Sequence, residues 1–535
     1  MNNTNTVTQE QLDACSNMLD KFKLRPPEIY YEMNERGMSQ LFADITHPYL
    51  TYNVTRKSWM FYNGNFWETD TGSLLVQREM KQFTRALLVY AVTELGNTNE
   101  EFSEFVESLS AASKRNTLIK DSTDYNYSSD DLFDTDIFLV NCINGTYNLK
   151  TQILQPHNPN DMITKIIRAN YTPGAYSAVL DKFLNDIFCN NQDVIRYVLR
   201  ALGYSLSGLN NQECLFIFLG ETTRNGKSTL LNTFSYLLGE GNGYSRNTDV
   251  ASLGQRKATN GSAPSSDICR LRGSRFVVAS EPKSDFVFDE GRIKTFTGND
   301  TITARMLYQN DVEFKPTFKI FIGTNNRPNV NDDSILESFR LRVVPFNRHF
   351  TAEEQNRNLK GQLKEQSALD ALFMKCIEGF NEFMQIGLAE PKEILEATAG
   401  YQTQGQIFQI FLDNQMTADA TATTPLATFY PAYQSWCMEN GFTPLNKTNI
   451  KRIMEQKGIF KATATIGGKT IRNILTGYAL PSATVQPANV QPQNVLQVNI
   501  ESANMQPITA VASVTKIEMD SLPLSNVFEE SDYPF

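Results

Sequence analysis

A glycine-bounded loop followed by a lysine and two hydroxyl residues has the clearest chemical potential in this sequence. Gly220-Glu-Thr-Thr-Arg-Asn-Gly226-Lys-Ser-Thr229 follows a continuous apolar run, Cys214–Leu219, and precedes a helical run that begins at Leu230. Backbone N–H groups of a loop that enters a helix can cradle phosphate oxygens, and a glycine lets the backbone approach them closely. The sequence therefore predicts a phosphate-binding loop, which is one residue longer than the usual spacing between the two glycines.

Side chains within this loop have distinct expected tasks. Lys227 supplies a point charge to the β- and γ-phosphates of a nucleotide, and the hydroxyl of Ser228 ligates Mg²⁺. The alternative is a chance Gly-Lys-Ser at the start of a helix, which the preceding apolar run and the following helix disfavour. We expect the nucleotide to be bound by Gly220, Asn225, Gly226, Lys227, Ser228 and Thr229.

Two further polar side chains follow apolar runs downstream of the loop. Glu281 lies just after Arg275–Ala279, where a carboxylate can orient the water that attacks a γ-phosphate. Asn325 comes after Phe318–Gly323, and its amide is suited to sensing that phosphate. Many phosphate-loop enzymes have a metal-orienting aspartate where this chain has Ser280, so Glu281 would carry most of the local negative charge.

A pair of arginines around the fourth apolar run, Leu341–Phe346, has two interpretations. Arg340 precedes the run and could reach the nucleotide of a neighbouring subunit as an arginine finger. Arg342 lies inside the run, where a packing or salt-bridge role is the better interpretation.

Short apolar runs separated by helical stretches indicate the fold of the middle of the chain. Fully apolar strands belong to a mainly parallel sheet with both faces covered, so we predict an α/β core. Residues 178–208 have the periodicity of amphipathic helices. Near the amino terminus, aromatic residues flank Asn63-Gly64 in the run 59–67, which predicts a hairpin with a buried aromatic core. We expect five segments along the chain. Residues 1–27 would be a disordered amino terminus, residues 28–205 an amino-terminal domain and residues 206–385 the core. Residues 386–480 would hold a linker helix and a small basic domain, and residues 481–535 a disordered tail.

Composition narrows the function classes. The net charge is −10, so contact with nucleic acid must come from local basic patches. The sequence has neither an apolar-cored leader nor an apolar run of about 18 residues, and we expect no membrane span and a cytoplasmic location. The cysteines are scattered without a CxxC pair, which disfavours structural zinc. Residues 130–136 are expected to form an acidic loop, although Asp134 and Asp136 are of a metal-binding type.

The order and spacing of these motifs resemble the superfamily-3 helicases, most closely the phage and plasmid primase–helicases related to the poxvirus primase–helicase. The matching segments are Phe138–Leu149, Pro156-His157, Gly203–Gly208, Leu271–Gly273, Ile293–Asp300, Ala304–Tyr308, Asn325–Pro328 and Arg342–Phe346. The resemblance covers roughly residues 30–480. It implies an AAA+-type P-loop NTPase core, an amino-terminal α+β helicase-associated domain and a carboxy-terminal winged-helix domain.

The resemblance also implies roles for individual residues. Lys227 and Ser228 would bind ATP and Mg²⁺, and Glu281 would be the catalytic acid beside the metal. Asn325 would be the sensor and Arg340 the finger. The family usually has an Arg-Arg pair at the finger, whereas Phe339 precedes Arg340 here.

Family members insert a β-hairpin that points into the channel of a ring, and residues 301–318 are expected to form it. Its turn would be Gln309-Asn-Asp311. Lys294 and Arg305 could contact DNA phosphates, and Tyr308 could stack on a base. Surface charge and core packing are the respective alternatives.

A basic stretch, residues 447–472, is the second candidate DNA contact. It holds seven Lys and Arg residues against a single acid, Glu455. Helical patterns over residues 427–436 and 448–456, followed by strands around a turn at 466–468, are typical of a winged helix. The expected DNA-binding residues are Lys447, Lys451, Arg452 and Lys469, and a solvated charged face is the alternative.

The last residues, Glu529–Phe535, resemble the acidic tip of bacterial single-stranded-DNA-binding proteins. We expect Phe535 and its acids to recruit host replication proteins that bind such tips, with a chance acidic terminus as the alternative.

Together, these features lead us to expect an ATP-hydrolysing replicative DNA helicase. It would translocate on single-stranded DNA as a homo-hexamer, unwind forks in phage or plasmid replication, act in a bacterial cell, and work with a separate primase. One alternative is an origin-binding initiator whose ATPase switches assembly. The other is a packaging-type motor, which the lack of a nuclease-like acidic cluster downstream disfavours.

Overall fold

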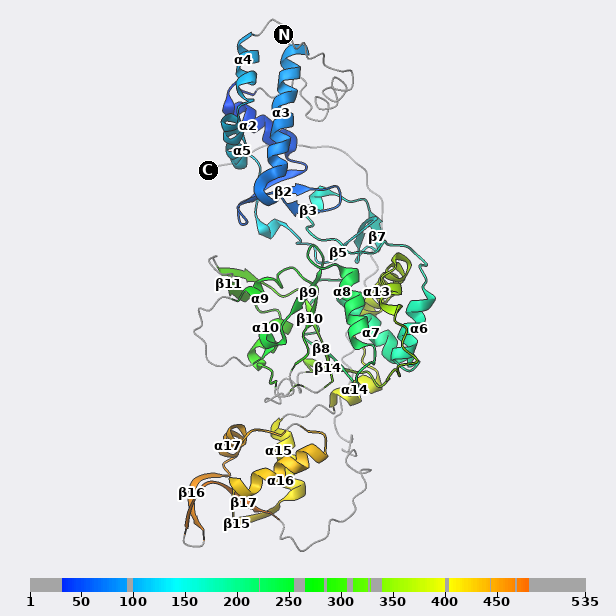
Figure 1. Cartoon of the computed structure of the whole chain (residues 1–535), viewed down its shortest axis with the longest axis vertical. Coiled ribbons are helices and arrows are strands. Elements are labelled where there is room, and N and C mark those ends of the chain that lie inside the picture. Colours follow the sequence, from blue (N-terminus) through cyan, green and yellow to red (C-terminus); the bar gives the residue numbers. More distant parts are fainter. Residues whose placement is uncertain are drawn as a thin grey trace, which may run out of the picture. The chain divides into compact units, whose positions relative to one another are not determined.

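The structure is a computed structural model with a mixed α/β fold (Figure 1). The chain separates into two units, residues 1–480 and 481–535. The structure describes residues 31–93, 100–220, 222–254, 265–282, 286–305, 311–325, 328, 339–399, 404–442, 444–466 and 469–480. The expected disordered segments 1–27 and 481–535, with the tip at Phe535, lie outside these residues.

The core is built on a five-stranded sheet in which every neighbouring pair of strands is parallel. The strand order is β14-β8-β13-β10-β9, and the strands are β8 (Leu215–Leu219), β9 (Ser245–Thr248), β10 (Phe276–Ala279), β13 (Lys319–Thr324) and β14 (Leu341–Pro345). The parallel sheet predicted from the four apolar runs is confirmed. Edge strand β9 was not predicted, because its sequence, Ser-Arg-Asn-Thr, contains no apolar residue.

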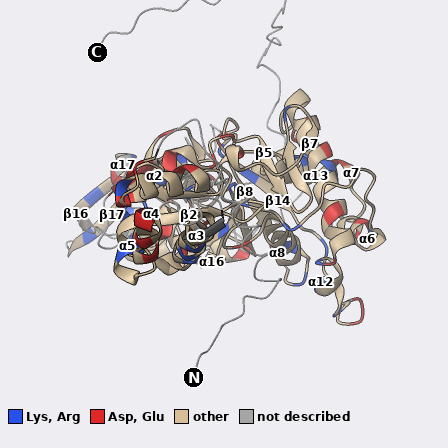
Figure 2. Ribbon diagram, turned by 90° about the horizontal axis from the view of Figure 1, so that it is seen from above, with Lys and Arg blue, Asp and Glu red and all other residues tan. Residues whose placement is uncertain are grey.

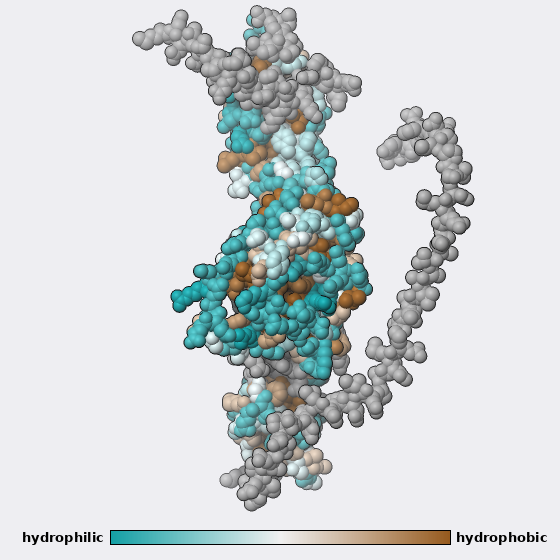
Figure 3. All heavy atoms as spheres, turned by 90° about the vertical axis from the view of Figure 1, so that its right-hand side faces the viewer, coloured by the Kyte–Doolittle hydropathy of each residue, from teal (hydrophilic) through white to brown (hydrophobic). Residues whose placement is uncertain are grey.

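Both faces of this sheet are covered. Phe216 and Phe218 of β8 pack into one core with α6 (Ala178–Ile187), α7 (Gln192–Tyr204), α8 (Lys227–Leu238) and α13 (Gln366–Ile386), while Leu215 and Ile217 pack into a second core with α10 (Glu290–Thr297). Successive strand residues point to opposite faces, so a continuous apolar run serves both cores. The described side chains on the face shown in Figure 3 are largely hydrophilic, with small hydrophobic patches between them.

Helices α7 and α13 approach each other closely through two glycines. A Cβ on Gly203 would lie 2.3 Å from the carbonyl oxygen of Cys376, and a Cβ on Gly379 would lie 2.3 Å from that of Leu199. Larger residues would therefore force these helices apart. The helical prediction for residues 178–208 is confirmed by α6 and α7, the second of which ends at Tyr204.

The amino-terminal region has its own sheets and helices (Figure 1). One sheet has the order β3-β2-β1-β4 and another the order β5-β6-β7. These strands are β1 (Leu50–Asn53), β2 (Ser58–Tyr62), β3 (Trp67–Thr69), β4 (Tyr127–Ser128), β5 (Leu139–Cys142), β6 (Gly145–Asn148) and β7 (Ile153–Gln155), and the helices are α2 (Glu35–Thr46), α3 (Leu74–Thr93), α4 (Glu100–Ser108) and α5 (Ala112–Asp121). The predicted hairpin is confirmed, since β2 and β3 pair antiparallel and Trp59 and Trp67 are buried.

Residues 404–480 form a small α/β region with its own apolar core. Its sheet is antiparallel, with the order β15-β17-β16. Its elements are α15 (Gln404–Gln415), β15 (Thr417–Pro425), α16 (Leu426–Glu439), α17 (Lys447–Gln456), β16 (Phe460–Ile466) and β17 (Lys469–Ala479). The two predicted helices and the two strands after them are confirmed, while β15 was not predicted because its sequence is mostly Thr and Ala. In the described part of the chain, no helix is long and apolar enough to cross a membrane.

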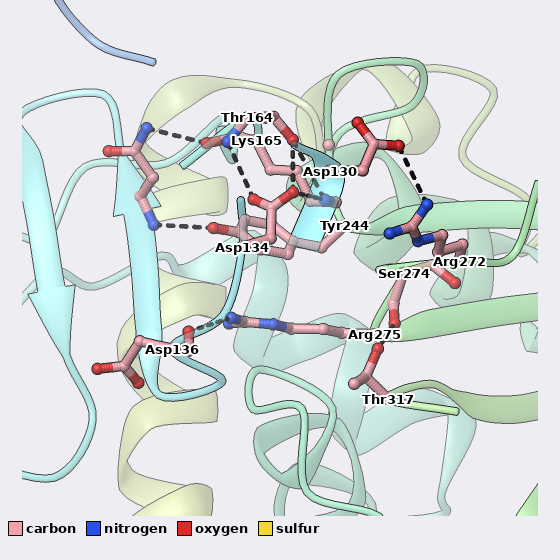
Figure 4. A network of polar contacts seen from close by, with 12 residues as sticks. Asp130, Asp134, Asp136, Thr164, Lys165, Tyr244, Arg272, Ser274, Arg275 and Thr317 are labelled. Atoms are coloured by element: carbon pink, nitrogen blue, oxygen red, sulfur yellow. Dashed lines mark hydrogen bonds and ion pairs between the residues drawn. The ribbon is translucent and has the colours of Figure 1, made fainter. Parts of the chain in front are cut away.

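The acidic loop 130–136 is neutralised by basic partners (Figure 4). Asp134 accepts a hydrogen bond from the ammonium of Lys165. It also accepts hydrogen bonds from the backbone N–H of Thr164 at 2.9 Å and from the Thr164 hydroxyl at 2.5 Å. Asp130 pairs with Arg56 at 2.6 Å and with Arg272 at 3.0 Å. These ion pairs anchor the loop to the segments that carry Arg56, Lys165 and Arg272.

We expect Asp134→Ala to lower the free energy of unfolding by about 3 kcal/mol, because it leaves the Lys165 ammonium buried without its counter-charge. The Lys165 side chain is only 8% exposed. Urea denaturation measures the loss. The matched control is Asp131→Ala on the same loop, whose carboxylate is exposed and whose removal should leave the midpoint unchanged. Equal midpoints for both variants would contradict the anchoring role.

Candidate nucleotide site

The predicted phosphate loop begins where β8 ends and leads into α8. Gly226 is the N-cap of this helix and has φ +90°, a conformation that residues with a Cβ rarely adopt. A Cβ there would also lie 2.4 Å from Cγ2 of Ile187. Glycine is therefore required at this position for two independent reasons.

Lys227 is the centre of the site. It is 6% exposed, and its ammonium donates to the side-chain oxygens of Asn325 at 2.8 Å and Asn225 at 3.1 Å, and to the carbonyl oxygen of Gly220 at 3.3 Å. Burial lowers the pKa of Lys227, and the negative charge of Glu281 acts against that shift. All three hydrogen-bond acceptors are neutral, so an anionic phosphate would be a stronger partner for this cation.

Asn225 and Gly220 shape the loop around the ammonium. Asn225 is buried, and its Nδ2 donates to the carbonyl oxygen of Thr222 at 2.5 Å. A Cβ on Gly220 would lie 2.2 Å from that same Nδ2 and 2.8 Å from the backbone carbonyl oxygen of Phe346, so a larger residue would displace its neighbours. Ser228 is exposed and Thr229 half-buried in the first turn of α8, which leaves the hydroxyl of Ser228 accessible to a metal.

The predicted acid and amide lie at the same edge of the sheet as the loop. The backbone N–H of Asn325 donates to Oε1 of Glu281 at 3.2 Å, while the side chain of Asn325 contacts Lys227. Residues predicted from three separate segments are therefore linked as a chain, Lys227 to Asn325 to Glu281. This follows from parallel pairing, which brings the carboxyl ends of β8, β13 and β10 to one edge.

The structure adds one acid that the sequence did not reveal. Asp249 follows β9, accepts a hydrogen bond from the N–H of Ala251 at 2.9 Å, and lies 3.4 Å from the hydroxyl of Ser280. It supplies a carboxylate next to Ser280, the position at which the sequence comparison with phosphate-loop enzymes led us to expect an aspartate. No sequence signal pointed to it, because β9 has no apolar run.

Both arginines around β14 have partners within the chain. Arg340 donates to Thr297 Oγ1 at 2.9 Å and pairs with Glu213 at 2.6 Å. Arg342 pairs with Glu390 at 2.5 Å, which confirms the salt-bridge interpretation. The finger role of Arg340 stays a prediction.

The expected hairpin is present, with different bounds from those predicted. β11 (Ile302–Arg305) pairs antiparallel with β12 (Asp311–Phe314), and Arg305 is opposite Asp311. Asp311 is therefore the first residue of a strand and not part of the turn, which was a wrong prediction. The error arose because Asn and Asp favour turns, whereas the cross-strand register places this acid 3.9 Å from Arg305. Tyr308 lies outside the described residues, and Lys294 is half-buried in the last turn of α10.

The basic stretch is spread over α17, β16 and β17, and Lys and Arg are visible on these strands in Figure 2. Lys447 lies 5.1 Å from the centroid of the Tyr430 ring. Lys451 lies 5.2 Å from that of Phe460 and 3.8 Å from Glu455. The side chains of the two other predicted contacts, Arg452 and Lys469, lie outside the described part.

Two family models match this chain. Residues 39–189 match the model described as D5 N terminal like, and residues 218–340 match a family of unknown function. The second match runs from the last residues of β8, through the phosphate loop, to Arg340. The predicted nucleotide site thus lies inside a segment shared with other proteins.

Relatives of the chain include viral proteins. It is 27% identical over 346 residues to "Putative helicase L207/L206" of Acanthamoeba polyphaga mimivirus, covering 60% of this chain and 36% of that protein. It is 28% identical over 308 residues to "Putative helicase 022R" of Frog virus 3, covering 53% and 30%. The chain is homologous to these viral proteins. It spans about a third of the length of the curated relatives it matches.

Among solved structures, the NrS-1 C-terminal region is similar at 13% identity and a TM-score of 0.40. The match covers 80% of this chain and 96% of that structure.

We expect Arg340→Ala to lower the free energy of unfolding by about 2 kcal/mol, because the variant cannot make the two charge-assisted hydrogen bonds within the chain. Urea denaturation at a concentration where the protein is monomeric measures this. The control is Arg348→Ala, whose partly exposed pair with Glu354 should contribute less. An unchanged midpoint for Arg340→Ala would indicate that the residue acts only between subunits.

Proposed function

We propose that this chain is an ATP-hydrolysing DNA helicase of superfamily 3, related to the D5 primase–helicases. The observation that carries this proposal is the convergence of Lys227, Asn325 and Glu281 at the carboxyl edge of a parallel sheet. The names of the viral relatives and the D5 N terminal like match support the same class. The strand order, with β8 between β14 and β13, supports an AAA+-type core.

The site has the chemistry that ATP phosphates require. Lys227 would exchange its neutral partners for phosphate oxygens, while N–H groups at the start of α8 add the positive end of the helix dipole. Ser228 and Glu281 would hold Mg²⁺, which would neutralise phosphate charge when bound. Glu281 would orient the attacking water. Asn325, hydrogen-bonded to both Lys227 and Glu281, would relay the presence of the γ-phosphate.

Binding and unwinding of DNA would require residues outside the nucleotide site. We propose a homo-hexameric ring in which Arg340 reaches the ATP of a neighbouring subunit and the hairpin β11–β12 faces single-stranded DNA. Arg305 on that hairpin, together with Lys294, would contact phosphates. We further propose that the protein unwinds forked DNA in phage or plasmid replication in a bacterial cell. A separate primase and host proteins bound by the Phe535 tip would be its partners.

The carboxy-terminal region favours a second candidate, an origin-binding initiator whose ATPase only switches assembly. Two helices followed by antiparallel strands, with basic residues on α17, β16 and β17, support this candidate, because a winged helix that holds duplex DNA would have such elements. The hairpin distinguishes the two functions, because only a helicase needs it for unwinding.

Strand displacement on a forked duplex with ATP tests the helicase proposal. We expect Lys227→Ala to lose both ATP hydrolysis and unwinding at least about 100-fold, because the phosphates lose their buried cation. Arg305→Ala should keep hydrolysis and lose unwinding, since the hairpin loses its cation for the strand. Lys315→Ala is the control, because Lys315 is an exposed cation just after β12. Hydrolysis and duplex binding by the wild type without unwinding on any fork would favour the initiator.

Duplex binding by the carboxy-terminal region has a salt signature. For the double variant Lys447→Ala/Lys451→Ala, the slope of log K against log salt should become shallower by about 2, one unit for each phosphate group that no longer has a lysine partner. Fluorescence anisotropy with a labelled duplex over a range of salt concentrations measures the slope. The control is Lys392→Ala/Lys364→Ala, which removes two cations outside residues 404–480. An equal change in slope for both double variants would show that only total charge matters.

A further inference from the structure

The phosphate loop, one residue longer than usual, and the residue before it accept hydrogen bonds from the segment that follows β14. The N–H of Phe346 donates to the carbonyl oxygen of Leu219 at 2.6 Å, and the N–H of Phe350 donates to that of Arg224 at 2.9 Å. Between them, Nδ1 of His349 donates to the carbonyl oxygen of Thr223 at 2.8 Å. We call residues 346–350 the strap, because their hydrogen bonds hold Leu219, Thr223 and Arg224.

Arg224 shows why the longer loop needs this support. Its φ is +60°, in the left-handed region that a residue with a Cβ adopts only at a cost. Such conformations persist where neighbouring groups over-determine them. Here the Arg224 carbonyl is held by the strap, and the adjacent Asn225 amide closes a turn onto Thr222 at 2.5 Å. Asn225 is also one of the three groups that hold the Lys227 ammonium.

The strap is itself fixed at both ends. Phe346 is buried, with its ring 5.1 Å from that of Phe218 on β8. Beyond Phe350, the Glu354 carboxylate accepts the N–H of Thr351 at 2.9 Å and pairs with Arg348. The Arg348 guanidinium lies 5.0 Å from the centroid of the Phe350 ring. The loop thus rests on a segment with its own anchors.

We propose that the strap holds the phosphate loop in the shape that binds the nucleotide, and that His349 is a positioning residue in it. This inference rests on the proposed nucleotide-binding function. His349 acts on the Thr223 carbonyl and not on reacting atoms, and through it on the turn that presents Asn225 to Lys227. The same strand, β14, begins after Arg340 and ends at the strap, so a displacement of the candidate finger would reach the loop through one rigid element.

The strap has a readout that needs no nucleotide. Hydrogen exchange of the nucleotide-free protein, followed in peptides that cover residues 219–226, should be about fivefold faster in His349→Ala, because one of the bonds that close the loop is removed. His349→Asn should restore slow exchange, since its Nδ2 can donate from nearly the position of the imidazole Nδ1. His47→Ala is the control, because His47 is exposed on the amino-terminal region, just after α2.

Nucleotide binding and turnover provide the second readout. His349→Ala should weaken binding of a fluorescent ATP analogue with Mg²⁺ about fivefold to tenfold and raise KM by a similar factor, with kcat changed less than about twofold. His349→Asn should stay close to the wild type in both. A fall in kcat with unchanged KM, or exchange in His349→Ala as slow as in the wild type, would overturn the proposal. A wild-type protein that binds no nucleotide would overturn the proposed function, while the exchange measurement would still decide on the strap.

Discussion

Parallel pairing of β8, β13 and β10 is the constraint on which the candidate site depends. It brings three chain segments, separated by up to a hundred residues or so, to one edge of a sheet whose faces are both buried. At that edge, the ammonium of Lys227 is held by Asn325, and the backbone of Asn325 is held by Glu281. Each strand can be continuous and apolar because its side chains alternate between two cores. The polar chemistry is thereby confined to the ends of the strands.

The opposite edge of the same sheet also carries cations, with a different role. Lys319, at the start of β13, is buried, and its ammonium donates to the carbonyl oxygens of Ser207 and Leu209 at 2.5 and 3.0 Å. Arg275, just before β10, donates to the carbonyl oxygen of Leu206 at 2.5 Å and packs on the Tyr244 ring (Figure 4). Burial shifts the pKa of Lys319 well below its usual value. Backbone carbonyls satisfy these groups, so they fasten the segment after α7 to the sheet.

The other cations that are candidates for DNA contact or for the finger role are paired with acids. The strength of each pair decides how readily the cation can exchange its partner. Arg305 faces Asp311 across the hairpin, and Lys451 lies near Glu455 on α17. Both pairs are partly exposed and long, so their attraction is weak. A DNA phosphate can therefore compete for these cations. The Arg340–Glu213 pair is shorter, at 2.6 Å, and its arginine is only 16% exposed, so a finger role would require that contact to be exchanged.

The parallel core, the helices before it, the aromatic hairpin and most elements of the carboxy-terminal region could be predicted from residue order alone. Each of them depends on a local period or an apolar run, so neighbouring residues are enough to specify it. Three other features depend on the folded chain. They are the register that places Asp311 in a strand, the presence of β9 with Asp249, and the contact of His349 with the phosphate loop. Strand β9 has no apolar residue, and its place follows from pairing with β10. The strap lies more than 120 residues from Thr223, and no local pattern encodes a contact over that separation.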